Sequence, residues 1–176
     1  MKTSFRSASE LDAGKISILV NRAYRPSAHE RGWTHEANLV SGQRTTEEQV
    51  LSLFCSRSSV LVLIQDTNIV ACVHVQCEEY SAVIGMLATD PGCQMQGFGK
   101  QILNYAEQFA FEHFATTTFK ISVLSPRTEL IAFYERRGYA RTGEMVGYPV
   151  SAGIGEPIVH GLQVEILTKQ MEKPSS

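Results

Sequence analysis

The sequence lacks several features that would point to particular classes of protein. Its 16 Lys and Arg residues do not outnumber its 18 Asp and Glu residues, so it has no basic excess typical of nucleic-acid binders. Its apolar runs, such as residues 60–64, are far shorter than the roughly 20 residues that a membrane-spanning helix needs. No long apolar stretch follows the basic residues near Met1. We therefore expect a cytoplasmic protein with no secretory signal, no membrane and no nucleic-acid partner.

Cysteine is scarce and shows no metal-binding spacing. The four cysteines, at positions 55, 72, 77 and 93, form no C-x-x-C pair, and the five histidines add no H-x-x-x-H. We expect free thiols in a reducing compartment and no metal site. The chain has 176 residues, of which 43% are hydrophobic, which is enough to bury a core. We expect one domain over residues 1–172, followed by a frayed tail at residues 173–176.

Hydrophobic periodicity predicts an α/β fold around a mixed sheet. Capping boxes are expected at Ser7–Glu10 and Thr45–Glu48, each at the start of a helix. Helical spacing predicts helices at residues 8–24, 46–55, 97–114 and 126–137. Strands are predicted at residues 3–7, 60–64, 69–79, 81–89, 117–124, 139–145 and 163–168.

Residues 87–100, LATDPGCQMQGFGK, form the most informative segment. A predicted strand is followed by a turn and by a glycine-rich loop that opens a helix. The backbone N–H groups at a helix start have no helical partner and lie at the positive end of the helix dipole, so they suit a phosphate. Gly97 and Gly99 let an anion approach the backbone, and Lys100 adds a cation. The same pattern also fits an ordinary strand-to-helix turn, and it is neither a P-loop nor a G-x-G-x-x-G fingerprint.

A second segment, residues 130–139, LIAFYERRGY, follows further along the chain. Together, Gln94-x-x-Gly97-x-Gly99 and this segment resemble two motifs of the GCN5-related N-acetyltransferase (GNAT) family. The first is similar to its pyrophosphate motif, and the second to its FYERxGF/Y segment. The order of elements resembles that family over nearly the whole chain. The resemblance implies a mixed, mostly antiparallel central sheet with splayed parallel strands and helices on both faces.

The resemblance also implies a function, which is acetyl-CoA-dependent N-acetyl transfer to a primary amine by direct attack on the thioester. The acceptor would be an amine of a small molecule or peptide, and the family's dimer contacts leave a homodimer open. Where family members often have Asn at the start of this helix, the chain departs from the pattern with residues 125–128, SPRT, and two readings of Arg127 stay open: contact with a phosphate of CoA, or a solvated residue at the helix start. The other residues that the resemblance assigns to acetyl-CoA are Met86, Leu87, Thr89, Gln94, Met95, Gln96, Gly97, Phe98, Gly99 and Lys100.

Five further residues are candidates for catalysis or for the acceptor site. Tyr134 has the motif position of the tyrosine that protonates the leaving thiolate, although helical spacing alone also fits a core aromatic. Its phenol, with an ordinary pKa of about 10, stays protonated at neutral pH as a general acid must. Glu79 or its neighbour Glu78 is the candidate base, directly or through water, and proton loss without a dedicated base stays open. Trp33 and Glu36 are acceptor candidates, and Trp33 equally fits an anchor of its loop.

Two non-enzymatic functions stay open. One is an acyl-CoA-binding sensor with the same fold and no turnover. The other is a protein-interaction domain that uses the aperiodic residues 25–44 and binds no acetyl-CoA. Tyr134 and the unbroken loop from Gln94 to Gly99 favour the enzyme.

Overall fold

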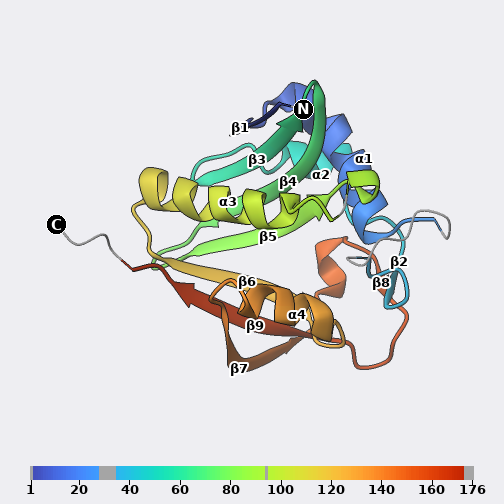
Figure 1. Ribbon diagram of the computed structural model, residues 1–176. Coiled ribbons are helices and arrows are strands. Elements are labelled where there is room, and N and C mark those ends of the chain that lie inside the picture. The colour runs from blue at the N-terminus through green and yellow to red at the C-terminus, as the bar shows by residue number, and fades with distance from the viewer. Residues whose placement is uncertain (1, 28–34, 94, 173–176) are drawn as a thin grey trace.

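The computed structural model describes residues 2–27, 35–93 and 95–172, and helices lie on both sides of its central sheet (Figure 1). The described strands are β1 Thr3–Ser7, β2 Val40–Ser41, β3 Ser58–Gln65, β4 Asn68–Cys77, β5 Ala82–Thr89, β6 Thr118–Leu124, β7 Ala140–Gly147, β8 Glu156–Pro157 and β9 Gln163–Gln170. The described α-helices are α1 Ala13–Tyr24, α2 Glu47–Leu51, α3 Phe98–Phe114 and α4 Thr128–Glu135. Single 3₁₀ turns are η1 Glu10–Asp12, η2 Pro91–Cys93 and η3 Val150–Ala152.

Seven of the described strands form one sheet in the order β1-β3-β4-β5-β6-β9-β7. All neighbours are antiparallel except β5 and β6, which run parallel. Their described pairing is confined to Ala82 with Phe119 and Val83 with Lys120, at the start of each strand. The expected mixed, mostly antiparallel sheet with splayed parallel strands is confirmed. The sequence did not predict the short β2–β8 ladder.

The two faces of the sheet are covered by different helices. Because alternate residues of a strand point to opposite faces, β3 buries Val60 and Val62 on one side and Leu61 and Leu63 on the other. The first pair packs with α1, whose stripe follows helical spacing, and the second pair packs with α3. No helix in the described ranges is long and apolar enough to span a membrane.

Both predicted capping boxes were displaced. The first box joins Ser9 and Asp12, because Ser7 is still paired within β1. The second joins Thr46 and Gln49, one residue later than predicted. Three α-helices are also shorter than expected, since α1 begins at Ala13, α2 ends at Leu51 and α4 begins two residues after Pro126. These errors move element boundaries and leave the topology intact.

Candidate active site

The chain between β5 and α3 forms a compact turn around Asp90. The Asp90 carboxylate accepts a hydrogen bond from the Gly92 N–H at 2.8 Å and lies 3.3 Å from Arg22 Nη1. Helix α3 begins after Gly97, whose φ of +74° lies in the left-handed region that favours glycine. No described side chain caps this 17-residue helix at Gly97. The N–H groups of its first turn can therefore bind an anion.

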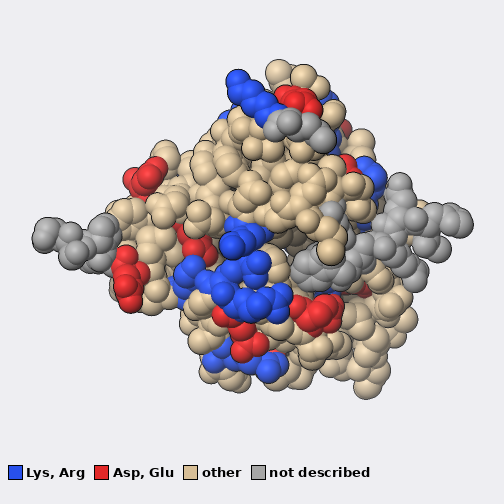
Figure 2. All heavy atoms as spheres, in the orientation of Figure 1, with Lys and Arg blue, Asp and Glu red and all other residues tan. Residues whose placement is uncertain are grey.

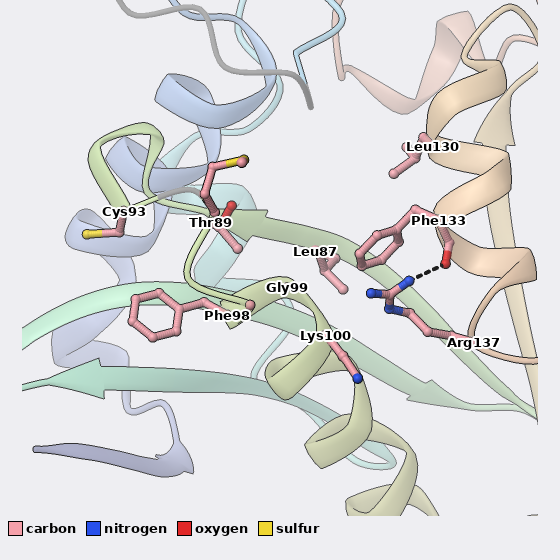
Figure 3. Close-up of a pocket in the computed structure, with 11 residues that line it drawn as sticks. Leu87, Thr89, Cys93, Phe98, Gly99, Lys100, Leu130, Phe133 and Arg137 are labelled. Atoms are coloured by element: carbon pink, nitrogen blue, oxygen red, sulfur yellow. Dashed lines mark hydrogen bonds between the residues drawn. The ribbon is translucent and has the colours of Figure 1, made fainter.

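A cavity of about 400 Å³, which we call the loop cavity, opens beside this helix start (Figure 3). In Figure 3, Leu130, Phe133 and Arg137 extend from the α4 segment toward Leu87 and Gly99. A Cβ atom at Gly99 would lie 3.6 Å from Phe133 Cζ, so it would point among residues that line the cavity. The described lining consists of Leu87, Thr89, Cys93, Met95, Gly97, Phe98, Gly99, Lys100, Leu130, Phe133 and Arg137.

A second hollow of about 570 Å³, the basic cavity, continues from the start of α3 toward the end of α4. Its described lining includes the cations Lys100, Arg136, Arg137 and Lys169, and Figure 2 shows Lys and Arg gathered in the middle of this face. Lys169 Nζ is 2.7 Å from Glu107 Oε1, so that cation is already paired. The remaining three cations make the basic cavity positive.

Arg137 lies where the loop cavity and the basic cavity meet. Its Nη1 donates to the Phe133 carbonyl oxygen at 2.8 Å, and its guanidinium lies 3.8 Å from the centre of the Phe133 ring. Its buried Nε has no hydrogen-bond partner within the described ranges. Burial, and then the positive charge of Arg136, lower the pKa of Arg137. A bound anion would relieve both effects, so this position suits a phosphate.

Strand β5 contains a bulge at the point where it leaves β6. In the register with β4, Met86 and Leu87 together oppose the single residue Val73. Met86 has a φ of +53°, a conformation that costs a residue with a side chain roughly 1–2 kcal/mol. Because β6 pairs with β5 only as far as Val83, Met86 and Leu87 belong to neither neighbouring ladder. The bulge therefore presents backbone groups between the splayed strands.

A third cavity of about 270 Å³, the cleft cavity, lies between the separated halves of β5 and β6. It shares Leu87 and Leu130 with the loop cavity, so the two cavities meet at the bulge. Tyr24 of α1 donates its hydroxyl hydrogen to the Leu87 carbonyl oxygen at 2.8 Å. This bond fixes the orientation of the Leu87 peptide from the α1 side.

Tyr134 lines the cleft cavity from α4. Its ring is 5% exposed and packs edge-on against Phe133 and Tyr139. No described residue hydrogen-bonds its hydroxyl. The hydroxyl oxygen is nevertheless not fully buried, so it stays accessible from the cavity. Burial, and then the nearby Tyr24, raise the pKa of Tyr134. Its hydroxyl is therefore protonated at neutral pH and open to the cavity.

A buried ion pair holds the outer wall of the cleft cavity. Arg25 Nη2 and Nε lie 2.6 and 3.0 Å from Glu36 Oε1, and the two side chains are 6% and 7% exposed. The same guanidinium donates to the carbonyl oxygens of Gly42 and Ile154, each at 2.8 Å. A Cβ at Gly155, where φ is +116°, would collide with Arg25 Nη1. Arg25 thus joins the segment after α1 to the β2–β8 region.

The predicted acetyl-CoA residues divide between the cavities. Met86 lines the cleft cavity, and Gln96 is exposed and outside the described linings. Arg127 lies elsewhere than expected, because its 4% exposed side chain lines the cleft cavity and not the phosphate-facing cavities. Gln94 lies outside the described residues. Those that line the loop cavity are Leu87, Thr89, Met95, Gly97, Phe98, Gly99 and Lys100.

The catalytic and acceptor candidates also separate. Tyr134 and Glu36 both line the cleft cavity, although Glu36 is bound by Arg25. Glu79 lies in the exposed turn between β4 and β5 and is absent from the described lining of the cleft cavity. The structure places Glu79 near the end of β5 where β5 and β6 are still paired, and it does not bring this residue together with Tyr134 and Glu36. Trp33 lies outside the described residues.

Several lining residues were missed from the sequence. Leu130, Phe133 and Arg137 follow helical spacing in the second motif, and this spacing would have placed them on one face. Tyr24 and Arg44 of the cleft cavity carry no local signal, since they reach it only through the tertiary fold.

Comparison with known proteins agrees with this geometry. Residues 56–141 match the family model described as an acetyltransferase (GNAT) domain. The chain contains a GNAT acetyltransferase domain. No curated protein matches the sequence.

Solved structures resemble the whole chain at low sequence identity. One is the ribosomal-protein-S18-alanine N-acetyltransferase from Escherichia coli, with a TM-score of 0.73, 18% identity, and 99% and 97% of the two chains covered. A second is a putative acetyltransferase from Salmonella typhimurium with acetyl-CoA, with a TM-score of 0.71, 14% identity, and 100% of this chain and 98% of that chain covered. A third is a GNAT acetyltransferase from Elizabethkingia anophelis with acetyl-CoA bound, with a TM-score of 0.66, 15% identity, and 96% of this chain and 98% of that chain covered. These likenesses show that the chain has the GNAT fold.

The segment that matches the family model has a structural meaning. It contains the bulge of β5, the glycine-rich loop, α3 and α4, and thus both motifs and Tyr134. It excludes Tyr24, Glu36 and Arg44, which line the cleft cavity. The GNAT pattern therefore covers the loop cavity, and the cleft cavity is completed by residues outside that pattern.

Proposed function

We propose that this protein is an acetyl-CoA-dependent N-acetyltransferase that acts on a primary amine by direct attack. The observation that carries the proposal is the meeting of the loop cavity and the cleft cavity at Leu87, where a strained bulge presents backbone groups. Two solved structures with this fold hold acetyl-CoA, which supports the assignment of the cofactor. In this proposal residues 1–172 act as one domain.

The loop cavity would hold acetyl-CoA. The pantetheine arm would follow the backbone of β5 at Met86, Leu87 and Thr89. Residues 94–100 would bind the pyrophosphate through the uncapped start of α3, which attracts anions. Lys100, Arg136 and Arg137 would supply the cations that further phosphate oxygens need.

The cleft cavity would hold the amine. The neutral amine nitrogen attacks the thioester carbon and forms a C–N bond, and the C–S bond breaks with its electron pair left on sulfur. The Leu87 N–H would stabilise the oxyanion that develops on the carbonyl oxygen, since it belongs to neither strand ladder. An alkylammonium has a pKa of about 10.4, so the acceptor must lose a proton before the attack.

Tyr134 would protonate the leaving thiolate. Its hydroxyl is open to the cleft cavity, no described residue hydrogen-bonds it, and its pKa is raised by burial. A group of this kind keeps its proton until a stronger base, such as a thiolate, forms beside it. Because Glu79 lies away from the cleft cavity, we assign the removal of the ammonium proton to water. Trp33 and Glu36 would belong to the acceptor wall, with Glu36 held by Arg25.

The test is release of the CoA thiol from acetyl-CoA in the presence of a panel of primary amines, together with calorimetric titration of acetyl-CoA. An enzyme releases thiol only when amine is present, and the acetylated amine appears in equal amount. Binding without amine-dependent release would identify a sensor, and absence of binding would contradict the assignment of the loop cavity.

A further inference from the structure

The described lining of the cleft cavity contains more cationic than acidic side chains. Two of its lining residues are Arg44 and Arg127, and its described carboxylate, Glu36, is already bound to Arg25. The Arg127 side chain is 4% exposed, and its Nε is 3.7 Å from an oxygen of Glu129, which is itself 55% exposed. A cation of an acceptor would therefore lie near the guanidinium of Arg44.

Arg44 is positioned without an acidic partner. Its backbone N–H donates to Asn21 Oδ1 at 2.8 Å, and Asn21 Nδ2 donates to the Thr45 carbonyl oxygen at 2.9 Å. Its guanidinium carbon lies 5.4 Å from the centre of the Tyr24 ring. No described carboxylate forms an ion pair with Arg44. The backbone and one ring thus hold Arg44 in place, and its charge stays available to a ligand.

We propose that the acceptor is a small primary amine that also carries a carboxylate, as an amino acid does, and that Arg44 binds the carboxylate. This inference rests on the proposed function, because it names the acceptor of the same site. A guanidinium presents paired N–H groups that match a carboxylate. The volume of about 270 Å³ and the apolar Ile84, Val146 and Val164 fit a small aliphatic side chain. Polyamines are disfavoured, since they add positive charge beside Arg44.

Tyr24 connects the carboxylate-binding group to the reacting position. The face of its ring lies under Arg44, and its hydroxyl is bound to the Leu87 carbonyl oxygen. One phenol ring therefore separates the two ends of the site. An amine close to its own carboxylate can be held by Arg44 and still face the thioester at Leu87. The transfer step is unchanged, since the C–N bond forms, the C–S bond breaks and the thiolate takes the Tyr134 proton.

The experiment compares each standard amino acid with the amine formed by removing its carboxylate, for example leucine with 3-methylbutylamine. Acetylation is followed by thiol release and by mass measurement of the product. We expect kcat/KM for the best amino acid to exceed that of its matched amine by roughly 10- to 100-fold, the range for a hydrogen bond to a charged group.

The variant Arg44→Met removes the charge and keeps much of the side-chain length. It should raise KM for the amino acid by roughly the same 10- to 100-fold, while acetyl-CoA affinity stays near its original value and KM for the matched amine does not rise. Arg44→Lys should recover part of the loss. Arg57→Met is the control, because Arg57 contacts Cys77 Sγ and lines none of the three cavities. Melting temperatures establish that all three variants are folded.

Three results would overturn the inference. They are equal or better acetylation of the amines without a carboxylate, an equal effect of Arg44→Met on both members of a pair, and acetyl-CoA binding with no amino acid acetylated. In the first two results the proposed acetyl transfer survives. Failure to bind acetyl-CoA would instead remove the proposed function, and this inference with it.

Discussion

The loop cavity and the cleft cavity share Leu87 and Leu130 and are built in different ways. The lining of the loop cavity comes from two short segments of the chain. One lies between residues 87 and 100 and includes Gly97, Gly99 and the uncapped start of α3, and the other runs from Leu130 to Arg137. The cleft cavity is made of side chains from positions as distant as Tyr24 and Val164. Backbone groups suit a ligand whose chemistry is fixed, such as a pyrophosphate. Side chains can be exchanged singly, so the acceptor can change while the cofactor stays the same.

The largest effect is expected from Tyr134, which lines the cleft cavity. Tyr134→Phe should lower kcat by roughly 10²- to 10⁴-fold, the usual contribution of a general acid. Acetyl-CoA affinity and melting temperature should change little, because no described residue hydrogen-bonds the Tyr134 hydroxyl. Rapid-quench kinetics and calorimetry measure these quantities. A chemical step at the original rate would show that Tyr134 is only a core aromatic.

A matched pair of glycine variants separates the cavities. Gly99→Val places methyl groups among Phe133, Thr89 and Leu87, and we expect acetyl-CoA affinity to fall by about 100-fold. Gly85→Val lies in β5, where nothing is within 4 Å of the added Cβ. It should raise KM for the acceptor and leave acetyl-CoA affinity unchanged, since Gly85 lines the cleft cavity.

Titration calorimetry and steady-state kinetics distinguish the two variants. A reversed pattern, or the same pattern in both, would show that the cavities do not bind different ligands. Gly97→Ala is a useful third variant, because its left-handed φ predicts a loss of stability rather than a filled cavity.

The contrast between the cavities explains what the sequence could predict. The loop was predictable because Gly97, Gly99 and Lys100 are neighbours in the chain and act through local geometry. Tyr134 was predictable because it lies inside a motif. Glu79 was misplaced because strand pairing, which the sequence does not state, decides at which end β5 and β6 separate. Arg44 was missed because its role depends on the distant Tyr24 ring.

A smaller effect is expected from the basic cavity. Arg137→Met should weaken acetyl-CoA binding by about 10-fold, because one charged contact to phosphate is lost and solvent screens those that remain. The loss should shrink at high salt concentration, while KM for the acceptor stays the same. Isothermal titration at two ionic strengths measures this, with Arg57→Met as the control. A salt-independent loss would indicate that Arg137 acts by packing on Phe133.

The smallest effect concerns His74, which reports the charge of Arg44. Burial, and then the positive charge of Arg44, lower the pKa of His74 from 6.5 to about 4. The Ser58 hydroxyl donates to the Leu53 carbonyl oxygen and lies 2.8 Å from His74 Nε2, so Nε2 carries the ring hydrogen. Between pH 6.5 and 4 the unfolded chain binds a proton that the folded chain does not. The free energy of unfolding should therefore decrease as the pH falls through this window.

The positive charge of Arg44 lowers the pKa of His74 less than burial does. Arg44→Met removes that charge, so the pKa of His74 should rise only part of the way toward 6.5. The loss of stability between pH 7 and pH 5 should become smaller in the same variant. NMR titration of the His74 ring proton, assigned with His74→Gln, measures the first quantity, and denaturant unfolding at the two pH values measures the second. An unchanged pKa would mean that the Arg44 charge is not felt on this side of β5. The positive surplus assigned to the cleft cavity would then lose one of its two sources, although the loop cavity would be unaffected.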